Sequence, residues 1–216
     1  MITKYGYDVF FSVSAICLVA LVLSIIFIEP RFLKFTTVIL VIVFWGLTVN
    51  FFRDPDRTTP TGNGLIIAPA DGTIIQIKEV AECEHFNEPA ILISIFMSPL
   101  NVHVNRNPIS GEVTYLRYVQ GEYFAAFEDK ASEKNEQMIV GMKGEKGWVL
   151  FKQIAGFVAR RIVCTLKNGD IVRAGERFGM IKFGSRVDVY VPKSSVILVK
   201  VNEVTAAGET VLARFQ

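Results

Sequence analysis

Three short stretches of the chain carry residues whose types could do chemistry. Asp71 lies in APADGTI, His103 lies in SPLNVHVNRNP, and the dipeptide Gly184-Ser185 interrupts an alternating apolar pattern in GMIKFGSRVDVYVP. A carboxylate, an imidazole and a hydroxyl are groups that acid–base and nucleophilic catalysis use. Each stretch also has an ordinary interpretation, as an Asp-Gly turn, a strand histidine and a common dipeptide. Taken singly, therefore, none of them assigns a function.

Residues that could hold a metal or form disulfides are few and scattered. The chain has two histidines, His85 and His103, and three cysteines, Cys17, Cys83 and Cys164. Their spacing matches no zinc site, and an odd number of cysteines, one of them inside an apolar span, indicates no disulfide framework. We therefore expect no metal cofactor, and the cysteines favour a reducing, cytoplasmic face. The net charge of +2 gives no sign of nucleic-acid binding.

The N-terminal quarter of the chain is far more apolar than the rest. Two runs, 9–28 and 35–52, contain no charged residue, and each approaches the roughly 20 residues that a helix needs to cross a bilayer. Pro30 between them suits a tight reversal. A cleaved signal peptide fits less well because a second apolar run follows at once, and uninterrupted apolar faces disfavour a buried helical pair. Residues 1–52 are therefore predicted to form a membrane-anchoring helical hairpin, whether spanning or partly interfacial.

The remainder is predicted to be mostly β. Residues 53–64 form a connector rich in Pro, Gly, Thr and Asp, and residues 65–216 have the size of one domain. Runs such as TIIQIKEV, AILISIFM and SVILVKVN recur between Gly-containing turns, and AGE occurs twice, at 174–176 and 207–209. These features predict a small β sandwich or barrel, with a short helical or mobile stretch only at 122–135.

Taken in order, the motifs resemble those of a known family. FFRDP after the anchor, APADG, the histidine of NVHVNRNP and FGS near the C-terminus are similar to phosphatidylserine decarboxylases, in particular the short prokaryotic form. The likeness covers nearly the whole chain, and the combination of motifs is far more specific than any single motif. In that family the Gly-Ser bond cleaves itself and the serine becomes a pyruvoyl cofactor. The resemblance thus implies a heterodimer of a β chain, 1–184, and an α chain, 185–216.

The resemblance also implies a mechanism. The hydroxyl of Ser185 attacks the carbonyl of Gly184 while His103, oriented by Asp71, takes the proton. The resulting ester eliminates and hydrolyses to the pyruvoyl ketone, with loss of ammonia. The ketone condenses with the amine of phosphatidylserine and acts as an electron sink, so that carbon dioxide and phosphatidylethanolamine are released. The interruption of the strand pattern is then the place where the cofactor forms.

One position departs from the family pattern. Many members carry two histidines three residues apart, and here Arg106 stands at the second place. His103 must then serve both self-cleavage and decarboxylation, or another group takes one role. Arg106, Arg160 and Arg161 are candidates for binding substrate carboxylate or phosphate, although solvated surface charge explains them equally well. A diacyl or ether-linked serine lipid and a higher oligomer remain open alternatives.

A second interpretation is not enzymatic. The stretch NGDIVRAGERFGMIKFGS is similar to the turn-rich strands of biotinyl and lipoyl carrier domains, which would make the protein a membrane-anchored adaptor. Lys182 is a poor modification site, however, because MIKFG lacks the flanking residues of either carrier motif. We therefore favour a self-cleaving zymogen of phospholipid biosynthesis, built around a carrier-like sandwich, in the cell membrane with its catalytic domain on the cytoplasmic face.

Overall fold

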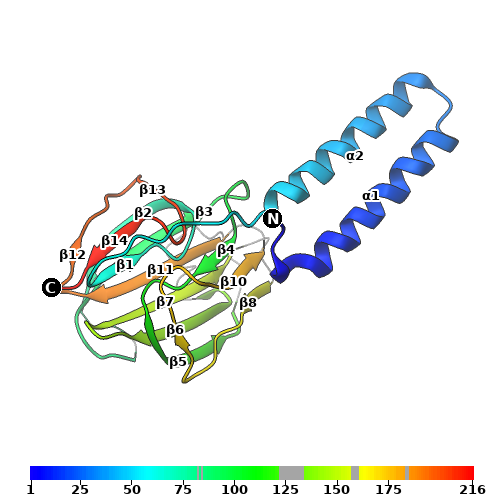
Figure 1. Ribbon diagram of the computed structural model, residues 1–216. Helices are drawn as coiled ribbons and strands as arrows, with labels where there is room; N and C mark the ends of the chain where they lie inside the picture. The colour runs from blue at the N-terminus through cyan, green and yellow to red at the C-terminus, as the bar shows by residue number, and fades with distance from the viewer. Residues whose placement is uncertain (82, 84, 122–133, 157–160, 183–184) are drawn as a thin grey trace. The chain divides into compact units, whose positions relative to one another are not determined.

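The computed structural model describes residues 1–81, 83, 85–121, 134–156, 161–182 and 185–216 (Figure 1). The chain divides into two compact units, Met1–Pro55 and Asp56–Gln216. Strands hold 40% of the described residues and helices 23%, so the prediction of a mostly β protein preceded by an apolar helical pair is confirmed.

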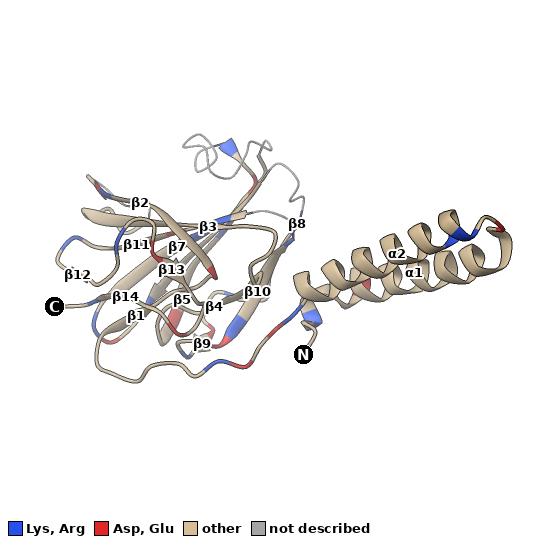
Figure 2. Cartoon of the chain, turned by 90° about the horizontal axis from the view of Figure 1, so that it is seen from above, with Lys and Arg blue, Asp and Glu red and all other residues tan. Residues whose placement is uncertain are grey.

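The first unit is a helical hairpin. A short 3-10 helix, η1 (Lys4–Gly6), leads into α1 (Tyr7–Phe27), and Pro30 precedes α2 (Arg31–Phe51). Each α-helix has 21 residues, and each is long and apolar enough to cross a membrane. Charged residues in this unit lie near the helix ends (Figure 2). Length and composition therefore agree with the predicted membrane anchor.

Contacts at its open end and along its length fix the hairpin. The N–H of Thr3 donates to the carbonyl of Phe52 at 2.9 Å. Farther along, Nε1 of Trp45 on α2 donates to Oγ of Ser14 on α1 at 3.1 Å. Because a hydrogen bond between two helices requires one particular alignment, this contact sets the register of α1 against α2.

The second unit is built around an eight-stranded antiparallel sheet that curls into a half-barrel, with strand order β13-β2-β3-β11-β7-β6-β5-β9. Its strands are β2 (Gly72–Val80), β3 (Ala90–Met97), β5 (Gly111–Val119), β6 (Gln137–Lys143), β7 (Trp148–Ala155), β9 (Ile171–Val172), β11 (Ser185–Pro192) and β13 (Val204–Thr205). Strand β11, near the C-terminus in sequence, thus lies in the middle of the sheet between β3 and β7.

Two three-stranded sheets complete the domain. The order β1-β14-β12 contains β1 (Leu65–Ile67), β12 (Val196–Ile197) and β14 (Val211–Arg214). The order β4-β10-β8 contains β4 (Val104–Arg106), β8 (Arg161–Cys164) and β10 (Arg177–Lys182). Strand β4 therefore pairs with the strand that leads toward Ser185.

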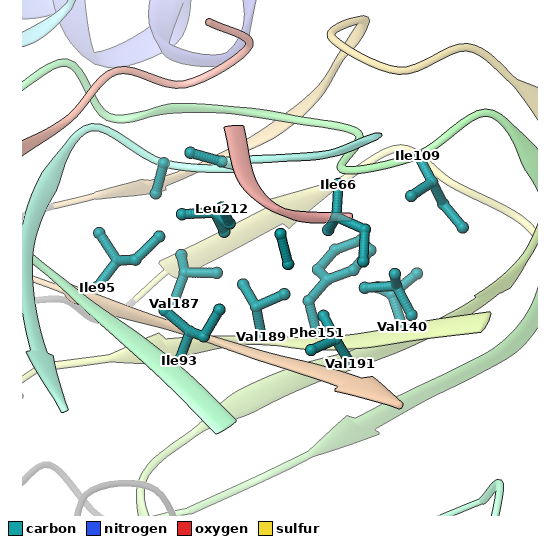
Figure 3. Packing of buried hydrophobic residues seen from close by; sticks show 14 of the residues in the cluster. Ile66, Ile93, Ile95, Ile109, Val140, Phe151, Val187, Val189, Val191 and Leu212 are labelled. Atoms are coloured by element: carbon teal, nitrogen blue, oxygen red, sulfur yellow. The ribbon is translucent and has the colours of Figure 1, made fainter. Parts of the chain in front are cut away.

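One face of β11 lies in the main apolar core. Val187, Val189 and Val191 alternate along it, as the period-2 pattern of the sequence requires (Figure 3). Across the sheet Val189 pairs with Ile93 of β3 and Phe151 of β7. Because side chains of paired residues share a face, these strands bury a continuous apolar layer.

The other face of β11 is polar and also buried. Arg186 and Asp188 form an ion pair of 2.6 Å, and their side chains are 1% and 0% exposed. Nη2 of Arg186 also donates to Oγ of Ser94 at 2.7 Å. Charges removed from water in this way need both their counter-charge and their hydrogen bonds. Strand β11 is thus enclosed on both faces, with Ser185 at its first position.

Candidate active site

Ser185 begins β11 in the middle of the large sheet. Its neighbours across the sheet are Met97, the last residue of β3, and Ala155, the last residue of β7. The side chain is completely buried, and Oγ donates to the sulfur of Met97 at 3.2 Å. A thioether is a weak acceptor, so this contact leaves the hydroxyl available to a stronger base. Gly184, its partner in the expected cleavage, lies outside the described residues.

The apolar core becomes polar beside Ser185. Asn105 of β4 and Gln153 of β7 are both fully buried there, and Nε2 of Gln153 donates to Oδ1 of Asn105 at 2.8 Å. Nδ2 of Asn105 donates to the carbonyl of Pro69 at 3.2 Å and lies 3.9 Å from the sulfur of Met97. The same sulfur thus contacts Ser185 and Asn105. We call Ser185, Asn105 and Gln153 the amide cluster.

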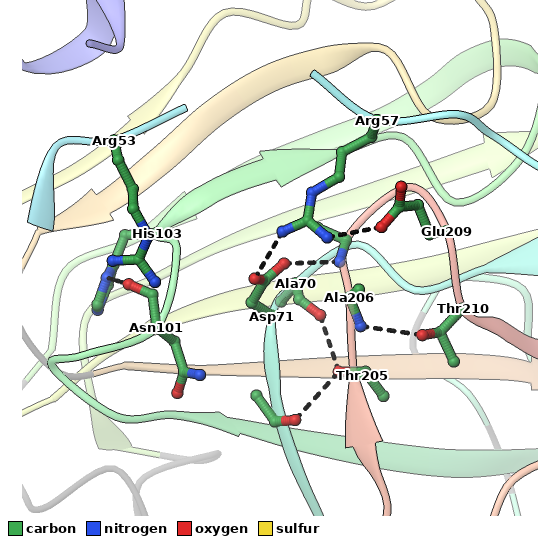
Figure 4. A network of polar contacts seen from close by, with 12 residues as sticks. Arg53, Arg57, Ala70, Asp71, Asn101, His103, Thr205, Ala206, Glu209 and Thr210 are labelled. Atoms are coloured by element: carbon green, nitrogen blue, oxygen red, sulfur yellow. Dashed lines mark hydrogen bonds and ion pairs between the residues drawn. The ribbon is translucent and has the colours of Figure 1, made fainter. Parts of the chain in front are cut away.

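His103 lies directly before β4 and is completely buried. Its Nδ1 is 2.9 Å from the carbonyl oxygen of Asn101 (Figure 4). Because a carbonyl only accepts, Nδ1 carries the proton in the neutral ring and Nε2 is the basic nitrogen. Asn101 is itself held by a turn, since its side chain accepts from the N–H of Ser98 at 2.8 Å. The turn after β3 therefore selects the tautomer of His103.

Asp71 is held by a second, charged group of residues (Figure 4). Its Oδ1 accepts from the N–H of Ala207 at 2.7 Å, and its Oδ2 pairs with Nη2 of Arg57 at 2.9 Å. Nη1 of Arg57 also pairs with Glu209 at 2.6 Å. Both carboxylate oxygens of Asp71 thus have partners, and His103 is not one of them. We call Arg57, Asp71 and Glu209 the carboxylate cluster.

Arg57 and Glu209 stabilise each other's charged forms. Burial lowers the pKa of Arg57, but the hydrogen bond and charge of Glu209 and the charge of Asp71 outweigh it, so the pKa lies above its usual value. The hydrogen bond from Arg57 lowers the pKa of Glu209. The side chains of Arg57 and Asp71 remain 15% and 13% exposed, so the pair is only partly removed from water. Arg57 is therefore a permanent cation that joins two carboxylates.

The structure places the three candidate arginines differently. Arg106 is buried on β4, and its Nη1 donates to the carbonyl of Gly175 at 2.9 Å. Its side chain also lies against Gly208, where a Cβ would collide with it. Gly175 and Gly208 are the glycines of the two AGE turns, and each has a φ of +79°. The repeated AGE sequence thus corresponds to two similar turns at Arg106.

The other two candidate arginines are not placed with it. Arg161 begins β8 and is exposed, and Arg160 lies outside the described residues.

Sequence reasoning missed most of the residues that surround the candidates. No motif in the sequence marks Asn101 or Asn105, and the one local signal for Gln153 is that it interrupts the apolar run WVLFKQIA. Arg57 was assigned to a connector. The second histidine, His85, lies in a loop with its ring stacked on Tyr115 at 4.2 Å. Among the described residues, no group of three or more His, Cys, Asp or Glu side chains could hold a metal ion.

The fold and the site together define a β half-barrel enzyme joined to a pair of apolar helices. The phosphatidylserine decarboxylase family matches residues 44–213. Proteins named phosphatidylserine decarboxylase proenzyme from Chlorobium limicola and Pelodictyon phaeoclathratiforme are each 44% identical over the full length of both chains. One of the same name from Cytophaga hutchinsonii is 42% identical over 99% of this chain and 98% of its own. The chain belongs to the phosphatidylserine decarboxylase family and is a decarboxylase, not an adaptor.

Proposed function

We propose that the chain cuts itself between Gly184 and Ser185 and then converts phosphatidylserine to phosphatidylethanolamine and carbon dioxide. The observation that carries the proposal is the setting of Ser185, buried at the start of a central strand beside amide side chains. Relatives named proenzymes, alike over their whole length, support self-processing. The diacyl or ether linkage of the lipid lies away from the reacting headgroup.

The residues present fit a pyruvoyl group at position 185. The neighbouring side chains, Met97 and the amides of Asn105 and Gln153, are neutral, which suits a carbonyl better than a charge. Such a group supplies an electron sink for loss of the headgroup carboxylate. Pairing with β3 and β7 along β11 would hold residue 185 in place after the cut, and would keep the α and β chains together.

His103 is the proposed base for self-cleavage. Its proton on Nδ1 is directed at Asn101, so Nε2 is the nitrogen that can take the proton of Ser185. The same imidazole, once protonated, is the proposed proton donor in decarboxylation, since Arg106 replaces the second histidine. Asp71 is proposed to orient His103 during cleavage, and this requires one of its oxygens to exchange its present partner, Arg57 or Ala207.

The helical hairpin is proposed to hold the enzyme in the cell membrane, with the catalytic domain on the cytoplasmic face. Two helices of spanning length would keep the domain at the bilayer in which its lipid substrate resides. Removing residues 1–52 should accordingly leave self-cleavage intact and weaken turnover of bilayer substrate.

Denaturing mass spectrometry of the purified full chain tests the proposal. We expect two chains that divide after Gly184, with the smaller one blocked to Edman degradation because its first residue is no longer an amine. Ser185→Ala should remain a single chain of 216 residues without activity. An active preparation of the uncut chain would refute the proposal.

A further inference from the structure

Beside Ser185, the core face of the large sheet carries a second fully buried polar side chain, that of Gln153. Paired side chains form rows across β3, β11 and β7. The first row is Met97, Ser185 and Ala155, and the second is Ile95, Val187 and Gln153. Gln153 is therefore the diagonal neighbour of Ser185 on the adjacent strand, within reach of a long side chain.

Hydrogen bonds determine how the oxygen and the NH2 group of Asn105 and of Gln153 are oriented. Asn105 must present its NH2 group to the carbonyl of Pro69, because a carbonyl only accepts. Its oxygen therefore faces Gln153, which must in turn present its own NH2 group to that oxygen. The oxygen of Gln153 is thus left as an acceptor, and it is buried without a hydrogen-bond partner among the described residues.

A buried acceptor without a donor costs stability, so the Gln153 oxygen calls for an explanation, and its place beside Ser185 points to a ligand. The chemistry of the ligand follows from the atom. A carboxylate or phosphate oxygen needs a donor, and the donor of Gln153 already serves Asn105. The remaining oxygen can bind an N–H or O–H donor, and the donor that a serine headgroup carries is its amine.

We propose that Oε1 of Gln153 accepts a hydrogen bond from the amino nitrogen of the lipid headgroup. The inference rests on the proposed function, in which that nitrogen must come to position 185, one diagonal step from Gln153. Asn105 acts as a positioning residue, because its hydrogen bond turns the Gln153 oxygen toward the ligand. Gln153 thereby distinguishes headgroups that carry an amine from those that do not.

Equilibrium binding to the processed full-length protein tests the proposal. The probes are dihexanoyl phosphatidylethanolamine, which carries the amine, and dihexanoyl phosphatidylethanol, which lacks it, titrated calorimetrically in detergent. Wild type is expected to prefer the amine-bearing lipid, and Gln153→Met, which keeps the length of the side chain, should reduce that preference about 10-fold. The extent of its self-cleavage is followed by mass, so that binding is compared only in processed protein.

Gln76 supplies a matched control. It is a glutamine whose Oε1 is likewise buried without a partner among the described residues, but it pairs with Ser94, on the opposite face of the sheet from Ser185. Gln76→Met should keep the wild-type preference. An equal loss in both variants would attribute the effect to packing and overturn the proposal.

Gln153→Glu keeps an acceptor at the site, so it tests whether residue 153 binds the lipid amine even if Gln153→Met does not fold. Its preference for the amine-bearing lipid should rise with pH as the carboxyl group ionises, and a preference independent of pH would overturn the proposal. So would an unchanged preference in processed Gln153→Met. If wild type itself stays a single chain, it is the proposed function that has failed.

Discussion

The amide cluster and the carboxylate cluster hold their side chains in place by different interactions, the first by hydrogen bonds between neutral groups and the second by ion pairs. The amide side chains around Ser185 are fully buried and neutral, and direct hydrogen bonds orient them. Arg57 and Asp71 are charged and keep some contact with water. Buried amides can be satisfied by a few neighbours, whereas charges removed from water need more compensation. The difference indicates that the amide cluster fixes the orientation of side chains around Ser185, whereas the carboxylate cluster fixes the position of charged groups.

The largest effect on self-cleavage is expected at His103, the proposed base, which belongs to neither cluster. His103→Ala should slow self-cleavage by about 1,000-fold or more, because it removes the group proposed to take the Ser185 proton. The measurement is the rate at which the newly synthesised full chain divides into two. His85→Ala is the matched control, since this second histidine stacks on Tyr115 in a loop. Rapid cleavage of His103→Ala would exclude the imidazole as the base.

Asp71→Asn tests whether the carboxylate cluster serves the chemistry. The amide can still accept from Ala207 but loses its charge, so we expect cleavage to slow by about 100-fold, the lower end of what acid–base assistance contributes. Glu209→Gln removes the other carboxylate on the same Arg57 and should change the cleavage rate less than about threefold. Equal slowing in both variants would mean that cleavage needs the intact cluster and not Asp71 in particular.

The Asn105→Ala variant compares the two clusters by their contribution to the free energy of unfolding. It removes a buried amide and leaves Gln153 without its acceptor, so the free energy of unfolding should fall by about 2–3 kcal/mol. Thermal unfolding of the full chain in detergent gives the difference. A loss no greater than that of Glu209→Gln would contradict the expectation that disrupting a fully buried amide pair costs more than disrupting a partly exposed ion pair.

The smallest expected effect is a pH dependence from Glu209. The folded pKa of this carboxyl lies below its unfolded value, so its ion pair contributes stability above the unfolded pKa, about 4.3, and loses it as pH falls through the folded pKa. Because the side chain is 38% exposed, the contribution should be at most about 1 kcal/mol. Unfolding of wild type and Glu209→Gln should differ near pH 7 and converge in acid. A constant difference across this range would count against the pair.

The elements of the fold were predictable from local patterns. Uncharged runs of bilayer length gave the hairpin, and period-2 alternation gave most strands. The same alternation was misleading in RVDVYVP, where Arg186 and Asp188 look solvent-facing but lie in a second buried layer. Burial on both faces depends on what covers a strand, and one strand's sequence does not contain that information.

The partners of the candidate site residues were beyond sequence reasoning. Arg57 meets Glu209 across 152 positions and Gln153 meets Asn105 across 48, and nothing local marks either pair. Asp56 is likewise held by Arg177 through an ion pair of 2.8 Å, so part of the expected connector lies on the β domain. Pairing of distant polar residues arises only when the strands that carry them are assembled.

The burial of Ser185 has a consequence for the kind of chain end that can exist there. Chain termini usually lie at the surface, where water solvates their charge. A hydrolytic cut before Ser185 would place an ammonium ion on a residue that is completely buried, and an ion there without a counter-charge is costly. The expected loss of ammonia removes that ion as the terminus forms. The proposed conversion to a ketone would thus make an electrophile and would also let a severed strand end inside the protein.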